Sequence, residues 1–115
     1  MTKKKISNKI DFKRVFYIGK RNESINLKVF ILKNQYSFNR LGIVIKKHVG
    51  IAVKRNKIKR QLKEIFNCLD RQLFQGHDII IFVKKSAAKL DYIDFLRELE
   101  NSFLKSNILT KKIKH

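Results

Sequence analysis

The chain has 115 residues, of which 28 are Lys or Arg and 9 are Asp or Glu, so its formal net charge is +19. That length fits one domain, and a hydrophobic share of 43% excludes a wholly disordered chain. The longest apolar run, Ile79 to Val83, is too short to span a bilayer, and the basic N-terminus lacks the apolar core of a signal peptide. The single cysteine, Cys68, cannot form an internal disulfide, so we predict a cytoplasmic protein.

The basic residues are unevenly distributed along the chain. Residues 1–63 hold 19 basic and 2 acidic side chains, whereas residues 64–115 hold 9 and 7. Part of the excess has another explanation, because 21 lysines against 7 arginines is also what an AT-rich genome encodes. That bias does not explain the placement, so we expect the first half to carry a surface for a polyanion.

The hydrophobic pattern predicts helices and strands with no repeat or linker between them. We therefore expect one domain over residues 1–115, with residues 1–6 and 110–115 as flexible basic tails. In chain order, the expected elements are a helix over 9–17 capped by Asn8, a strand over 25–32, a polar turn over 34–39, a strand over 41–46, a helix over 52–74, a strand over 78–84 and a helix that begins at Asp91. This mixture predicts an α+β sandwich.

The long helix expected over 52–74 has two distinct faces. At 100° per residue its apolar side chains gather on one side: Ile58, Leu62, Ile65, Phe66 and Leu69. Residues 46–63 contain eight basic side chains and no acidic one. Like charges four residues apart repel on a helix, as Lys59 and Lys63 do, so a bound polyanion would stabilise it. A solvated, lysine-rich face is the alternative interpretation.

Four blocks of the sequence resemble a known family. AVKRNKIKR, from Ala52 to Arg60, closely matches the signature of the bacterial ribonuclease P protein subunit family, in which an "RNR" helix binds RNA. The blocks DFKRVFYIGK from Asp11, DIIIFVKKSA from Asp78 and LDYIDFLRELENSF from Leu90 resemble that family's first helix, last strand and last helix. The blocks occur in the family's order, and the resemblance covers roughly residues 8–108.

This resemblance implies a fold and a function. The implied fold is a central, mostly four-stranded sheet packed with helices in the order α-β-β-β-α-β-α, with an unusual left-handed βαβ crossover. The implied function is that of a non-catalytic subunit, which binds a catalytic RNA and the 5′ leader of precursor tRNA. The RNA, with Mg²⁺, cuts off the leader. The implied partners are ribonuclease P RNA and precursor tRNA, with no cofactor on the protein, no membrane and no protein partner.

The resemblance also assigns contacts with the catalytic RNA to the long helix. The implied contacts are Lys54, Arg55, Asn56, Lys57, Lys59, Arg60 and Lys63. Lys57 stands where the family has arginine, and lysine keeps the charge but loses the two-pronged donor geometry. Just before the helix, Lys46, Lys47 and His48 replace the family's Ser-Lys-Lys.

Aromatic residues supply a second candidate surface. Phe12 and Phe16 are one helical turn apart, and spacing alone favours a core role for both. In the resembled family, the corresponding positions line a cleft between the first helix and the sheet that holds the leader. Bases stack on aromatic rings without sequence preference, which suits this task. The expected cleft residues are Phe12, Phe16, Lys28, Phe30 and Lys46.

We find no pattern that indicates independent catalysis. His48, His77 and His115 have no metal-ligand spacing with Cys68, so we expect no protein metal site. The acidic residues of the last helix are expected at its terminus and on its solvent face: Asp91, Asp94, Glu98 and Glu100. A ribosomal protein or general RNA chaperone is the main alternative. A peripheral membrane protein is disfavoured, because the basic helix has compact aliphatic residues on its apolar side.

Overall fold

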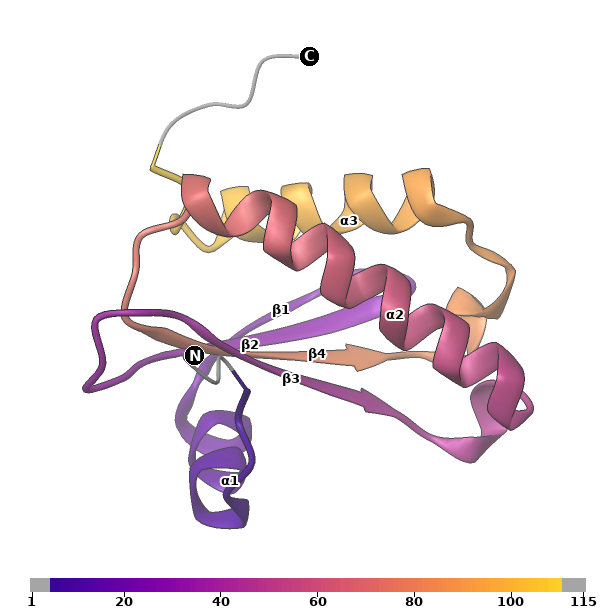
Figure 1. Ribbon diagram of the computed structural model, residues 1–115, viewed down its shortest axis with the longest axis horizontal. Helices are drawn as coiled ribbons and strands as arrows, with labels where there is room; N and C mark the ends of the chain where they lie inside the picture. Colours follow the sequence, from indigo (N-terminus) through magenta and orange to yellow (C-terminus); the bar gives the residue numbers. More distant parts are fainter. Residues whose placement is uncertain (1–4, 111–115) are drawn as a thin grey trace.

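The computed structural model describes residues 5–110, which form the expected succession of helices and strands (Figure 1). Its elements are α1 (Lys9–Ile18), β1 (Lys20–Glu23), β2 (Leu27–Lys33), β3 (Arg40–Ile45), α2 (Ala52–Leu69), β4 (His77–Val83) and α3 (Tyr92–Lys105), with 3₁₀ turns η1 (Lys47–Val49), η2 (Asp70–Gln72) and η3 (Lys85–Lys89). The order α-β-β-β-α-β-α is confirmed, and β1 is the strand for which the sequence pattern gave no range.

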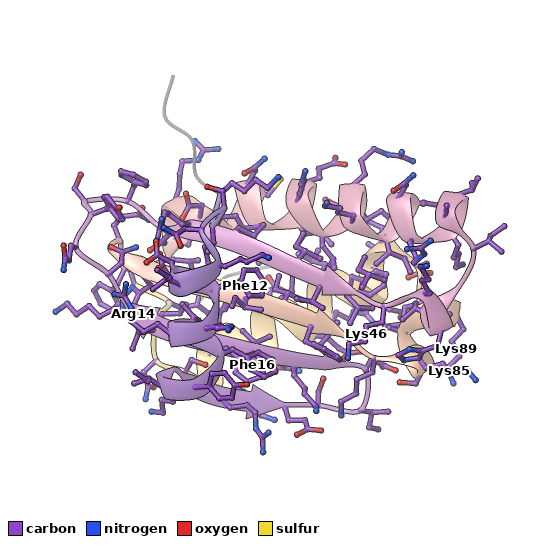
Figure 2. The ribbon with its side chains drawn as sticks, turned by 90° about the horizontal axis from the view of Figure 1, so that it is seen from below. Phe12, Arg14, Phe16, Lys46, Lys85 and Lys89 are labelled. Carbon is purple, nitrogen blue, oxygen red and sulfur yellow. The ribbon has the colours of Figure 1, made fainter. Side chains whose placement is uncertain are left out.

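The four strands form one mixed sheet in the order β1-β2-β4-β3. Strands β1 and β2 pair antiparallel, as do β2 and β4, whereas β4 and β3 are parallel and are connected through α2. Seen from the α2 side with the strands of this pair pointing upward, β4 lies to the left of β3 (Figures 1 and 2). The crossover is therefore left-handed, whereas about 98% of such connections are right-handed.

Helices cover the two faces of the sheet unequally. Helices α2 and α3 lie on one face and α1 lies on the other (Figure 1). The expected apolar side of α2 is confirmed, because all five of its residues are buried in the main core: Ile58, Leu62, Ile65, Phe66 and Leu69. Strand β4 is buried on both sides, since Ile79 and Ile81 belong to the main core while Ile80 belongs to the smaller cluster under α1.

Helix α1 is held against the sheet by its cap and by close packing. The Asn8 side-chain oxygen accepts a hydrogen bond from the backbone N–H of Ile10 (2.7 Å), as an N-cap should. Val15 is completely buried in the smaller cluster. A Cβ at Gly42 of β3 would lie 2.8 Å from Cε2 of Phe12, so the absence of a side chain there lets α1 approach the sheet.

The sequence predicted a longer helix than the structure has, and this expectation was wrong. Helix α2 ends at Leu69 instead of residue 74, because the following residue, Asp70, is buried and bonded elsewhere. Its carboxylate accepts hydrogen bonds from Asn39 Nδ2 (2.9 Å) and Gln75 Nε2 (3.2 Å), and the chain turns through η2. Gly76, with φ +91°, then redirects the backbone into β4, a conformation that favours glycine.

Three further boundaries differ from the expectation. Strand β2 begins at Leu27, and Ile25 lies in the preceding turn with 82% of its surface exposed. The expected N-terminal tail is partly ordered, because Ile6 is buried and its N–H donates to the Leu41 carbonyl (3.0 Å). Thr110 is likewise bonded, through its N–H, to the Gln72 carbonyl (2.6 Å). Residues 1–4 and 111–115 of the expected tails lie outside the described residues.

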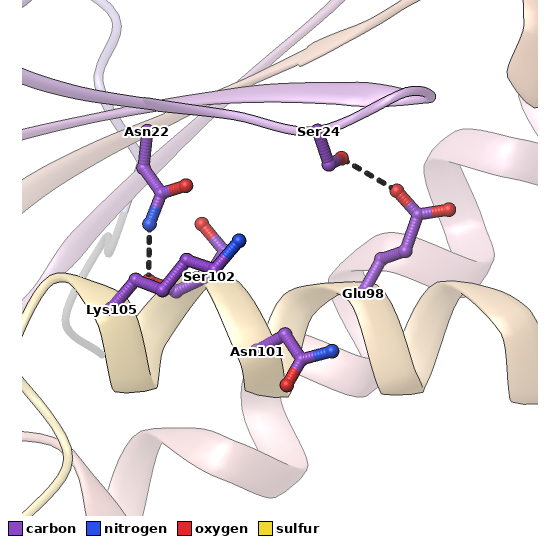
Figure 3. A pocket seen from close by; sticks show the side chains of 6 residues that line it. All are labelled: Asn22, Ser24, Glu98, Asn101, Ser102 and Lys105. Atoms are coloured by element: carbon purple, nitrogen blue, oxygen red, sulfur yellow. Dashed lines mark hydrogen bonds between the residues drawn. The ribbon is translucent and has the colours of Figure 1, made fainter.

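Polar contacts attach α3 to the hairpin formed by β1 and β2 (Figure 3). Glu98 accepts hydrogen bonds from Ser24 Oγ (2.7 Å) and from Asn26 Nδ2, and Asn22 Nδ2 donates to the Ser102 carbonyl (2.9 Å). The expectation that Glu98 is a solvent-face charge was therefore wrong. The acidic start of α3 is as expected, because Asp91 and Asp94 form a reciprocal capping box there.

Candidate nucleic-acid interface

The outer side of α2 carries the residues that the resemblance assigns to the catalytic RNA. We call them the α2 surface: Lys54, Arg55, Asn56, Lys57, Lys59, Arg60 and Lys63. The side chains of Lys54 and Arg55 are half-buried, and the other five are exposed. Asn56, Lys57, Arg60 and Lys63 lie on the side of the helix away from its buried residues. Lys54, Arg55 and Lys59 flank that side, and the exposed charges are accessible to a polyanion.

The N-terminal end of α2 adds further positive potential to the same surface. Arg55 Nε donates a hydrogen bond to the Gly50 carbonyl (3.0 Å), which holds the guanidinium beside the start of the helix. The N-cap, Ile51, supplies no side-chain hydrogen bond to the first turn. The positive end of the helix dipole therefore reinforces the basic side chains.

The opposite face of the sheet carries the expected aromatic residues. The ring of Phe16 on α1 lies over that of Phe30 on β2, with centroids 4.7 Å apart and an interplanar angle of 32°. Phe16 is 39% exposed, whereas Phe30 is only 4% exposed. Phe12 is half-buried against Gly42. Only Phe16 of these three therefore presents much of its ring to solvent, and Phe30 supports it from below.

Phe82 is an aromatic residue of this face that our sequence interpretation missed. Its ring lies between two lysines, with Lys28 Nζ 5.4 Å and Lys46 Nζ 5.7 Å from the centroid, and it is half-buried. Lys28 pairs with Phe82 across β2 and β4, and Val44 pairs with it on the other side. We call the group formed by Phe16, Lys28, Phe82 and Lys46, together with the supporting Phe12 and Phe30, the cleft surface.

Further lysines lie at the end of the sheet where β3 and β4 finish. Figure 2 shows Lys85 and Lys89, both from η3, near Lys46. Both are exposed, so they extend the positive charge of the cleft surface beyond Phe82. Lys84 is engaged differently: its Nζ lies 2.6 Å from Glu23 Oε2, and this hydrogen bond lowers the pKa of the Glu23 carboxyl.

A buried ion pair fixes α1 and two strands relative to one another. Arg40 donates from Nε to Asp78 Oδ1 (2.8 Å) and from a terminal nitrogen to Asp78 Oδ2 (2.6 Å). The same terminal nitrogen lies 3.2 Å from Asp11 Oδ2 on α1. These carboxylates raise the pKa of Arg40, which stays charged, and the guanidinium also lies over the ring of Tyr36 (4.7 Å).

The described residues do not assemble a metal site. Within residues 5–110, no three His, Cys, Asp or Glu side chains converge in a way that could hold a metal ion. In the same part of the chain, no helix is long and apolar enough to cross a membrane.

The fold and these two surfaces define a class: a small basic RNA-binding protein built on a mixed α+β sheet. Comparison with known proteins identifies the family. A family model described as ribonuclease P matches residues 1–107. The ribonuclease P protein component of Clostridium botulinum (strain 657 / Type Ba4) is 35% identical over 109 residues, covering 94% of this chain and 98% of that protein. The component of Natranaerobius thermophilus is 34% identical over 102 residues, or 89% of each chain.

Solved structures agree with this assignment. The Staphylococcus aureus ribonuclease P protein matches with a TM-score of 0.87 and 27% identity, over 94% of this chain and 99% of that one. The Thermotoga maritima protein matches with a TM-score of 0.73 and 27% identity, over 96% and 98%. The chain therefore belongs to the bacterial ribonuclease P protein component family. It is the protein component of an endoribonuclease holoenzyme that processes tRNA, and membership implies association with ribonuclease P RNA.

Proposed function

We propose that this protein binds the catalytic RNA through the α2 surface and the 5′ leader of precursor tRNA through the cleft surface. The α2 surface and the cleft surface lie on opposite sides of the same sheet, so a single domain can hold both RNAs at once. In this role the protein supports removal of the leader to give the mature 5′ end of the tRNA. We place this activity in the cytoplasm.

The observation that carries the leader proposal is the position of Phe82 between Lys28 and Lys46. A single strand needs platforms for its unstacked bases and cations for its phosphates, and this arrangement offers an aromatic ring flanked by two lysines. Phe16 provides a second and more exposed ring, over Phe30, whose partner on β4 is Ile80, two residues before Phe82. Stacking and charge read no particular base, which suits leaders of varied sequence.

The proposal for the α2 surface rests on charge and exposure. Arg60 and Lys63 are exposed on α2, next to Asn56 and Lys57. Binding RNA phosphates would offset the repulsion between these like charges and release counterions from the RNA. Lys57 provides charge at the centre of this patch, although it lacks the fork with which arginine holds a phosphate.

We assign hydrolysis to the RNA subunit, with Mg²⁺ held by RNA activating the attacking water. Reconstitution tests this division. Protein purified free of RNA should leave precursor tRNA intact in Mg²⁺, whereas adding ribonuclease P RNA should give a single cut at the mature 5′ end. Cleavage by rigorously RNA-free protein at that position would contradict the assignment.

A ribosomal or chaperone role is the competing function. Sequencing the RNA that copurifies with the protein from cells distinguishes the two. A single enriched ribonuclease P RNA supports the proposal, whereas ribosomal RNA in proportion to total ribosomes would favour the alternative.

A further inference from the structure

A pocket of about 130 Å³ opens at the outer edge of β3, where the N-terminal segment, α1 and α2 meet. Ile6, Phe12 and Ile43 contribute apolar walls. Three lysines surround the pocket: Lys5 from the N-terminal segment, and Lys59 and Lys63 from α2. The pocket lies between the two surfaces described above, since Phe12 belongs to the cleft surface and the two α2 lysines belong to the α2 surface.

The lining has the chemistry of a nucleotide site. A cavity of about 150 Å³ holds one benzene ring. This pocket is slightly smaller but open to solvent on one side, so a single-ring base could enter it in part, and a two-ring base would not fit. Phe12 offers an aromatic contact for that base. None of the lining residues is acidic, and the three lysines can hold the phosphates on either side of the inserted nucleotide.

The backbone of β3 adds hydrogen-bonding groups to the pocket. Strand β3 is the last strand of the sheet, and at Leu41 its outer edge is already used, because the Leu41 carbonyl accepts from Ile6 N–H. Backbone groups alternate in direction along a strand, so the N–H and C=O of Ile43 face the same outer edge. They lie where the Watson–Crick edge of a splayed-out base could meet them.

We propose that this pocket holds one unpaired pyrimidine nucleotide of the ribonuclease P RNA. The inference rests on the proposed function of the α2 surface, because Lys59 and Lys63 serve both. The catalytic RNA is the occupant rather than the leader, because two of the three lysines come from α2. The rings of Phe16 and Phe82 lie over β2 and on β4, inside the β3 edge that carries the pocket.

Photo-crosslinking in the assembled holoenzyme tests the occupant. A benzophenone amino acid replaces Lys5, which is exposed at the rim, and the holoenzyme is irradiated with precursor tRNA bound. The crosslink should map to one unpaired pyrimidine of the ribonuclease P RNA. A crosslink to the leader, to many scattered nucleotides or to no RNA would overturn the proposal.

A pocket-filling variant, Ile43→Trp, separates insertion from mere proximity. Losing one inserted base should weaken assembly by about tenfold, given roughly 1–3 kcal/mol for each stacked base. An abasic nucleotide at the crosslinked position should weaken the unmodified protein similarly and Ile43→Trp hardly at all. Independent losses from the two changes would overturn the proposal, and so would unchanged affinity of a folded Ile43→Trp protein.

If Ile43→Trp lowers the melting temperature of the protein, a variant that removes only a charge still tests the proposal. Lys5→Ala should flatten the log–log salt dependence of assembly by about 0.7, while Lys9→Ala, an exposed lysine on α1 outside the pocket, should not. Equal slopes for the two variants would remove the pocket from the RNA interface.

If replacing Arg60, which lies outside the pocket, weakens assembly while the pocket variants do not, only this inference fails. If Arg60 also has no effect, the proposed function of α2 fails as well.

Discussion

Arg40 on β3 and Asp78 on β4 are direct partners in the register of these parallel strands. Their side chains form an ion pair with two hydrogen bonds, of 2.8 Å and 2.6 Å. Both residues are buried, at 9% and 4% exposure. Asp11 joins the pair from α1 at 3.2 Å, so one guanidinium connects the cleft-forming helix to the sheet. Together with the packing of Val15, this connection fixes α1, from which the rings of Phe12 and Phe16 project over the sheet.

Replacing Asp78 by alanine should strongly destabilise the fold. The change leaves Arg40 charged and buried with one of its two carboxylates gone, and breaking a buried pair costs about 3–5 kcal/mol. Thermal or urea unfolding measures the loss. Asp11→Ala is the matched control, because this carboxylate is more exposed and its loss should cost about 1 kcal/mol or less. Equal losses for the two variants would contradict a central role for the Arg40–Asp78 pair.

Phe82→Ala and Phe16→Ala should each weaken binding of leader-bearing precursor tRNA by about tenfold, with little effect on mature tRNA. The reason is the loss of one stacking platform, worth roughly 1–3 kcal/mol. Equilibrium binding of both tRNAs to the holoenzyme measures the difference. Phe74→Ala is the control, since Phe74 is 52% exposed and lies outside the cleft surface. Equal weakening for both tRNAs, with a lowered melting temperature, would mean that the rings are core residues only.

The difference between Phe16 and Phe82 illustrates what the sequence allowed us to predict. Spacing alone favoured a core role for Phe16, and only the family resemblance suggested a cleft position for it. Phe82 lies in an apolar run that indicates a strand covered on both faces, and nothing in that run specifies its neighbours. Its lysines come from residues 28 and 46, and only the pairing register of β2, β4 and β3 brings them to one ring.

Features set by neighbouring residues in the sequence were predicted correctly, whereas features set by residues far apart in the sequence were not. The buried side of α2 was predictable because its period of 3.6 residues is local. Glu98 was misjudged because its partners, Ser24 and Asn26, are 74 and 72 residues away along the chain. The end of α2 was misjudged for a similar reason, since Asp70 bonds to Asn39 on a distant loop.

Lys28→Ala and Lys46→Ala should each flatten the salt dependence of leader binding by about 0.7 in log–log slope, the value expected for one phosphate contact on a single strand. Both lysines flank Phe82, so each can reach a phosphate of a strand stacked there. Titrations of precursor tRNA at several salt concentrations provide the slopes. Lys33→Ala supplies the control on the same strand as Lys28, because Lys33 is exposed and lies outside the cleft surface. A slope for Lys28→Ala equal to that for Lys33→Ala would argue against a phosphate contact.

Replacing both Arg60 and Lys63 by alanine should separate the two surfaces. Both side chains are exposed on α2, so the melting temperature should hardly change, and removing Lys63 relieves its repulsion with Lys59. Assembly with ribonuclease P RNA should nevertheless weaken, and its log–log salt slope should flatten by about 0.7–0.9 for each lost phosphate contact. Arg97→Ala with Lys105→Ala removes the same charges from exposed positions on α3 and should leave assembly nearly unchanged.

Discrimination between precursor and mature tRNA should survive in the Arg60 and Lys63 variant when the protein saturates the RNA, because the cleft surface lies on the other face of the sheet. If α2 held the leader instead, this discrimination would vanish while assembly stayed normal, and an unchanged salt slope would remove α2 from the RNA interface altogether.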